Sequence, residues 1–199
     1  MGRAGDEATV KEAQYRFAHS FFGGPPLEAG LRATVLAIVA ENADGLIWDQ
    51  LHMLAKSASS AIEKADYYRL LGAAKDPVLV DKALALSISG EMETTTAPGI
   101  VRRVSMSHPM TALTFAIEHW STLQPMLETM AQNRYMPALA APSSDLAILK
   151  PLSDFAKAHI PATGDGELRK TEAGIRSNAE TRRRTLPDID RWMATNSGM

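Results

Sequence analysis

Five histidines are the residues of this chain best suited to metal binding or proton transfer, and their spacing limits what they can do. They are His19, His52, His108, His119 and His159. A metallopeptidase helix carries two histidines four residues apart in the pattern H-E-x-x-H, and no two of these five have that spacing. Cysteine is absent, so cysteine-ligated zinc is excluded as well. We therefore predict no catalytic residue, no metal site and no cofactor in this chain.

Other catalytic signatures are also missing. The 199 residues contain no G-x-S-x-G, no P-loop and no G-x-G-x-x-G, so the sequence favours neither a serine hydrolase nor a nucleotide-binding protein. A catalytic site assembled from distant residues would leave no such motif. A small all-α enzyme with an unrecognised site therefore stays open as one interpretation of this chain.

The charge pattern argues against nucleic acid and membrane partners. Net charge is −2, which gives no attraction to polyanions. The basic run Arg182–Arg184 lies in a segment, residues 165–193, that holds seven basic and six acidic residues, and this balance is typical of a solvated helix face. No apolar run is long enough to span a bilayer, and the N-terminus lacks the apolar core of a signal peptide. We expect a cytoplasmic protein, although the chain can be a fragment of a longer one.

The residue pattern predicts helices throughout. The central stretch, residues 65–91, shows two amphipathic segments joined by Lys75-Asp76-Pro77. Asp76 can cap the second segment, and Pro77 suits a first helical position. Gly90 can end it in a left-handed conformation. We therefore expect an αα-hairpin here, and we find no convincing alternation of period two in the chain.

The helix starts are evenly spaced. Asp44, Asp76 and His108 each precede a predicted helix and follow one another at intervals of 32 residues. Such spacing is typical of stacked helix pairs. The predicted fold is therefore all-α, a curved HEAT-like superhelix of about ten antiparallel helices, and the concave side of such arrays usually binds partners.

We expect one helical-repeat domain over residues 1–199. Residues 6–160 form the stacked pairs, and residues 165–195 form a long C-terminal helix. Its apolar stripe consists of Leu168, Ile175, Ala179, Leu186, Ile189 and Met193. Pro187 is expected to divide this helix, because the residue before a proline disfavours the helical conformation.

Three stretches together resemble a known family. They are YYRLLGAAKDPVLVDKALALSISGE, TTAPGIVRRVSMSHP and ALTFAIEHW. With Trp48-Asp49-Gln50-Leu51 before them, they resemble the C-terminal helical domain of the aminopeptidase N and puromycin-sensitive aminopeptidase family. The resemblance covers residues 6 to about 194, and its motifs consist mainly of packing residues.

The resemblance implies a division of labour. In that family a separate thermolysin-like domain carries the zinc and removes N-terminal residues from peptides. The C-terminal domain closes over that site and shapes peptide access. By this resemblance the partners are the catalytic domain of the same polypeptide and peptide substrates, and zinc belongs to the parent enzyme. The catalytic zinc domain is absent from this chain, so no catalytic residue can be transferred.

Four residues are candidates for the substrate-facing surface. Glu91 and Thr95 lie on the polar connector after the central hairpin, and Arg102 and Arg103 lie on the helix that follows. A guanidinium group suits the binding of carboxylates because its donors match two oxygens. The alternative function is a free-standing helical-repeat scaffold that binds another protein along its groove.

Overall fold

The chain is all-α in the part that the structure describes. The computed structural model describes residues 6–196, without the side chains of residues 162, 193, 194 and 196, and this part holds eleven α-helices and no strand. It falls into two compact units, one ending at Ser107 and the other beginning at His108. The predicted all-α class is confirmed. The curvature of the array and the single domain over residues 1–199 stay predictions.

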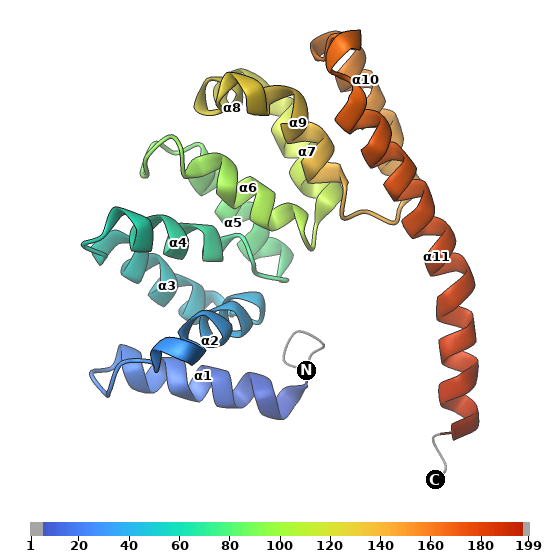
Figure 1. The fold of residues 1–199 in the computed structure, drawn as a ribbon. Coiled ribbons are helices and arrows are strands. Elements are labelled where there is room, and N and C mark those ends of the chain that lie inside the picture. The colour runs from blue at the N-terminus through green and yellow to red at the C-terminus, as the bar shows by residue number, and fades with distance from the viewer. Residues whose placement is uncertain (1–5, 197–199) are drawn as a thin grey trace. The chain divides into compact units, whose positions relative to one another are not determined.

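The first unit consists of six helices that pack in successive pairs (Figure 1). The helices are α1 (Glu7–Phe21), α2 (Ala29–Glu41), α3 (Gly45–Ser57), α4 (Ala61–Leu71), α5 (Pro77–Ser87) and α6 (Ala97–Ser105). Helix α1 packs on α2, α3 on α4, and α5 on α6, while α4 also contacts α6. Stacked pairs of this kind bury a continuous apolar core, because each pair covers the open face of the one before it.

The evenly spaced helix starts are confirmed. Asp44 precedes α3 and accepts a hydrogen bond from the Ile47 backbone N–H, and Asp76 precedes α5 and accepts one from Val78. His108 precedes the first helix of the second unit without a side-chain cap. The interval of 32 residues therefore separates the first helices of successive pairs.

The predicted hairpin over residues 65–91 is wrong in its pairing. Helices α4 and α5 do form, but α4 packs mainly on α3 and α6, and α5 packs on α6. The indole Nε1 of Trp48 on α3 donates to the Leu71 carbonyl at 3.1 Å, which joins α3 to the end of α4. A Cβ at Gly72 would come within 2.6 Å of the Ile100 carbonyl oxygen, so glycine lets α4 approach α6. Periodicity identified the apolar faces but not the neighbours that cover them.

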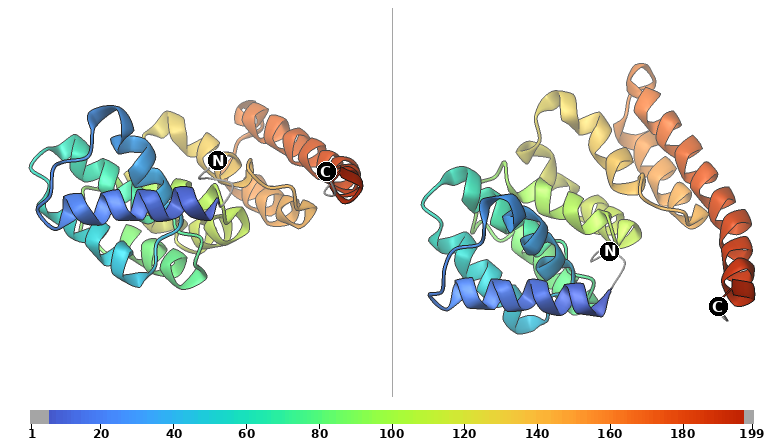
Figure 2. Two further views of the ribbon diagram at one scale, coloured as in Figure 1. Left: turned by 90° about the horizontal axis from the view of Figure 1, so that it is seen from below. Right: turned by 60° about the horizontal axis from the view of Figure 1, so that its bottom comes forward.

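The second unit consists of five α-helices and three short 3-10 turns (Figure 2). They are α7 (Pro109–Glu118), α8 (Trp120–Leu123), η2 (Gln124–Met126), α9 (Thr129–Ala140), η3 (Leu146–Ile148), α10 (Leu149–His159), η4 (Ala162–Gly164) and α11 (Gly166–Asn196). Helix α9 packs on α7, α10 and α11. Its residues Met136 and Leu139 are fully buried, so α9 forms the centre of this unit.

The C-terminal helix does not divide at Pro187. Helix α11 runs without a break from Gly166 to Asn196, with Pro187 inside it. Proline removes one backbone donor and leaves the carbonyl four residues earlier, that of Arg183, without its helical partner. Every described side chain from residue 180 to 192 is exposed, so water can satisfy this carbonyl. Of the predicted stripe, Ile175 is buried and Leu186 and Ile189 are exposed, and the side chain of Met193 lies outside the described part.

Candidate functional site

Glu91 lies at the centre of a polar cluster in the first unit. Gly90 adopts φ +78° and turns the chain after α5. The Glu91 carboxylate then contacts His52 Nε2 at 2.5 Å, accepts a hydrogen bond from the Tyr68 hydroxyl at 3.0 Å, and pairs with Lys56 Nζ at 3.2 Å. His52 and Lys56 belong to α3 and Tyr68 belongs to α4. The cluster therefore holds the connector after α5 against the preceding helix pair.

The electrostatics of this cluster favour a charged Glu91 and a neutral Tyr68. Burial alone would raise the pKa of the Glu91 carboxyl, but the hydrogen bonds from His52, Lys56 and Tyr68 outweigh it and lower the pKa. Burial, together with the neighbouring carboxylate of Glu91, raises the pKa of Tyr68 to about 12. Three side chains on α3 and α4 already contact the carboxylate of Glu91. In this structure Glu91 therefore links the connector after α5 to these two helices.

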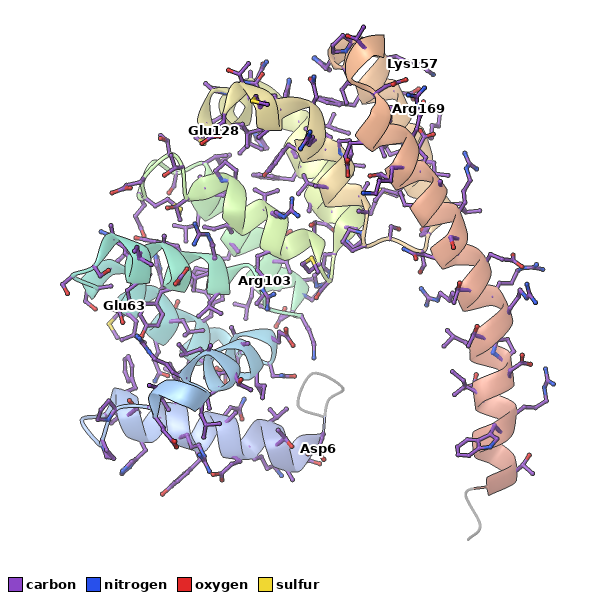
Figure 3. All side chains as sticks on the ribbon, viewed as in Figure 1. Asp6, Glu63, Arg103, Glu128, Lys157 and Arg169 are labelled. Atoms are coloured by element: carbon purple, nitrogen blue, oxygen red, sulfur yellow. The ribbon has the colours of Figure 1, made fainter. Side chains whose placement is uncertain are left out.

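The two adjacent arginines of α6 have different surroundings. Arg102 is exposed. Arg103 is partly buried and pairs through Nη2 with the Glu41 carboxylate of α2 at 3.1 Å. The Nε of Arg103 is buried and has no hydrogen-bond partner among the described residues. Figure 3 labels Arg103 on α6. Arg103 therefore joins α6 to α2.

The structure does not bring the four predicted residues together. Thr95 is exposed on the connector. Within residues 6–196, no hydrogen bond or ion pair joins any two of Glu91, Thr95, Arg102 and Arg103. Their proposed role in facing a substrate stays a prediction. Glu91, Thr95 and Arg102 are exposed and Arg103 is partly buried, and of the three exposed residues Glu91 is held by the ion pairs described above.

An apolar groove with one polar trio is the feature that the sequence did not reveal. Arg32 of α2 donates to the Tyr67 hydroxyl at 2.9 Å, pairs with Glu63, and lies 5.7 Å from the Tyr67 ring centroid. Tyr67 and Glu63 belong to α4, and Figure 3 labels Glu63. The hydrogen bond that Arg32 donates to Glu63, followed by the one that it donates to Tyr67, raises the pKa of Arg32. Arg32 and Glu63 are 31 residues apart, and no local pattern in the sequence pairs them.

Two adjoining hollows flank this trio. One encloses about 370 Å³ and is walled by Ala29, Ala33, Leu36, Asp66 and Leu70. The other encloses about 510 Å³ and is walled mainly by Phe17, Phe21, Pro26, Leu27 and Leu54. Arg32, Glu63 and Tyr67 line both hollows. An apolar groove with a few polar groups is the usual character of a binding site, and we call these two hollows with their trio the Arg32 groove.

Neither a cluster of metal-binding side chains nor a membrane-spanning helix occurs in the described part of the chain. Between residues 6 and 196, no three His, Asp or Glu side chains converge closely enough to hold a metal ion. The same range contains no helix of the length and apolar character that a membrane span requires.

The sequence matches one family model over most of its length. The family model described as "ERAP1-like C-terminal domain" matches residues 1–177. This range includes the whole first unit and the second unit through residue 177 of α11. The match agrees with the resemblance that the central stretches suggested, and it covers most of the 199 residues. The chain belongs to the ERAP1-like C-terminal domain family, the helical C-terminal domains of aminopeptidases.

Proposed function

We propose that this chain is the non-catalytic C-terminal domain of a zinc aminopeptidase, and that it closes over a separate catalytic domain and shapes the access of peptides. The observation that carries the proposal is the family match over residues 1–177. The sequence lacks H-E-x-x-H, which fits a domain whose partner carries the metal. A closing domain promotes catalysis by excluding bulk water and by limiting which substrates reach the metal.

The surface that meets the peptide includes Thr95 and Arg102 in this proposal. Both side chains are exposed within the first unit, and Arg102 can bind a peptide carboxylate through two donors. The Arg32 groove is a second candidate contact, because its walls are apolar and its trio offers both charges. Glu91 and Arg103 support this surface by holding the connector and α6 in place.

The first experiment tests whether the chain is catalytic on its own. The purified chain is incubated with zinc and a panel of aminoacyl fluorogenic amides, and bound metal is measured in the same sample. We expect no turnover and no stoichiometric zinc. Turnover that depends on bound zinc would overturn the proposal.

The second experiment tests the role in peptide access. In the polypeptide that joins this domain to its catalytic domain, Arg102→Ala should change kcat/KM unequally across peptides of different length and leave an aminoacyl amide unaffected. Lys150→Ala is the matched control, because Lys150 is 84% exposed and belongs to the second unit. If Arg102→Ala changes nothing at any peptide length, the role of Arg102 is excluded.

The alternative function is a free-standing helical-repeat scaffold. The Arg32 groove favours it, because an apolar groove along stacked helices can bind a partner helix. The two functions differ in the upstream reading frame. A catalytic domain with H-E-x-x-H directly before this chain supports the aminopeptidase domain, and a reading frame that begins at Met1 supports the scaffold.

A further inference from the structure

The last part of α11 lies beyond the family match and carries an exposed apolar stripe. The match ends at residue 177, and α11 continues to Asn196. In Figure 1 and in the right view of Figure 2, no other helix of the second unit lies beside the end of α11. Leu186 is 46% exposed, Ile189 is 44% exposed and Trp192 is 66% exposed. Large apolar side chains gathered on one helix face usually mark an interaction surface.

The stripe has the spacing of a coiled-coil seam. Positions 175, 179, 182, 186 and 189 follow one another at intervals of four and three residues. Four of these positions are apolar, and position 182 is Arg182, which donates to the Ser144 hydroxyl at 3.1 Å. Such spacing places side chains along one line of a helix that can pack on a second helix. Ile175, at the start of this line, is fully buried within the second unit. Leu186 and Ile189, at its other end, continue the same line into solvent.

The charges of this segment differ in sign between its two ends. Before Leu186 come Glu180 and three arginines, Arg182, Arg183 and Arg184, with a net charge of +2, and after it come Asp188, Asp190 and Arg191, with a net charge of −1. Arg183 and Asp190 are seven residues apart and lie on the same flank of the stripe, because seven residues make two turns. Within residues 6–196, Asp190 forms no salt bridge. One end of this segment is therefore the electrostatic complement of the other.

We propose that residues 180–192 of α11 pair in antiparallel orientation with the same segment of a second copy of this chain. In this arrangement Leu186 of each copy packs against Ile189 of the other. Arg183 of each copy then lies beside Asp190 of the other, so two equivalent ion pairs flank the apolar contact. A parallel pair in register would instead place the three arginines of one copy against those of the other, which is repulsive. This inference concerns a segment outside the family match and does not depend on the proposed function.

The first test measures the mass of the whole chain in solution. Sedimentation velocity over a wide range of concentration should show the mass rise from 21.5 kDa towards twice that value. Ile189→Glu should keep the chain monomeric, because each of the two copies would place a negative charge in the apolar contact. Since Ile189 is exposed, this variant should retain the helical circular dichroism of the wild type. A wild-type chain that stays monomeric up to about 1 mM, well above the Kd of ordinary weak complexes, would overturn the proposal.

Charge variants test the orientation. Arg183→Glu should weaken the dimer at least about tenfold, since it faces Asp190 of the second copy. Arg184→Glu is a matched control, because both arginines pair with Glu180 and only Arg183 lies on the flank of the stripe. The double variant R183E/D190R exchanges the charges and should restore the dimer. Equal effects of Arg183→Glu and Arg184→Glu would exclude the antiparallel register.

Introduced cysteines give an independent readout, since the chain has none of its own. Chains with Arg183→Cys and chains with Asp190→Cys are mixed and oxidised. The antiparallel pair predicts a disulfide between the two kinds of chain, and it predicts few disulfides between two chains of the same kind. A predominance of disulfides between two Arg183→Cys chains would indicate a parallel pair and contradict the proposal.

Discussion

The two units use charged residues in different ways. In the first unit, some ion pairs are local on α1 and α4, but others join residues far apart in the sequence, such as Arg32 with Glu63 and Arg103 with Glu41. In the second unit, each ion pair between described residues joins positions three or four apart, on one helix or, for Asp165, between a helix and the residue directly before it. The long-range pairs select which helices become neighbours, whereas the local pairs stabilise a single helix.

The second unit joins its helices mainly through apolar and aromatic contacts instead. The ring of Trp120 meets that of Phe155 edge to face at 5.1 Å, and Phe155 stacks on His159 at 4.4 Å. Leu152 and Ile175 are fully buried. Apolar contacts are not directional, so this unit depends on shape where the first unit also depends on charge. Stability should respond to salt and pH in the first unit more than in the second.

Leu152→Ala should give the largest loss of stability. Removing a fully buried leucine leaves a cavity, and it should lower the free energy of unfolding of the second unit by about 2–5 kcal/mol. The loss should be the same at low and high salt, because no charge is involved. Amide hydrogen exchange in α9 and α10 measures it. A loss that depends strongly on salt would contradict the contrast between the two units.

Glu41→Gln should have the next largest effect. The side chain of Glu41 is 13% exposed. Replacing its carboxylate by a neutral amide leaves the guanidinium of Arg103 without the anion that it pairs with. We expect the first unit to lose about 1–3 kcal/mol, measured by hydrogen exchange in α2 and α6. Asp154→Asn is the control, because its ion pairs with Lys150 and Lys157 are local and exposed. If both variants are equally stable, the long-range pair has no special role.

The Glu91 cluster predicts how the stability of the first unit depends on pH. The pKa of Glu91 lies below its ordinary value of 4.5 in the folded chain, so the stabilisation is present above that value and is lost as the pH falls through the folded pKa. The pKa of Tyr68 is raised from 10.0 to about 12, so its stabilisation is complete below pH 10.0 and is lost as the pH rises towards 12.

Variants of the cluster test both limbs of this pH profile. Glu91→Gln should remove much of the acid limb, and Tyr68→Phe should remove much of the alkaline limb. Urea unfolding at a series of pH values measures both effects. Glu93→Gln is the control, because Glu93 is an exposed residue of the same connector. A profile that is unchanged in Glu91→Gln would show that other groups produce the acid limb.

Lys82→Met should produce the smallest effect. Lys82 pairs with Asp49 at 2.6 Å and lies 4.1 Å from the centroid of the Trp48 ring, so it joins α5 to α3. Because the pair is half exposed, we expect a loss of only about 0.5–1 kcal/mol. The control is Lys150→Met, whose partner is also 2.6 Å away but lies on the same helix. Urea unfolding of both variants decides whether the contact between helices matters more than the local one.

Several features of the fold were predictable from the sequence, because local physical chemistry produces them. Asp44 and Asp76 cap their helices through contacts with residues two or three positions away, and the interval between them revealed the repeat. The two amphipathic segments expected over residues 65–91 did form helices, and Tyr68 on the first of them is 1% exposed. Pro187 shows the limit of a local rule, because the helix continues through it where water surrounds the chain.

The sequence by itself determined the helical class, the helix starts and the family, since caps, periodicity and packing motifs are written in neighbouring residues. Only the tertiary structure decided what each charged candidate does. Glu91 meets His52 across 39 residues, and Arg103 meets Glu41 across 62. Contacts over such separations depend on how helix pairs stack, and that stacking depends on the shape of the whole core. Arg102 and Arg103 are neighbours of the same type, yet one lies in solvent and the other joins two helices.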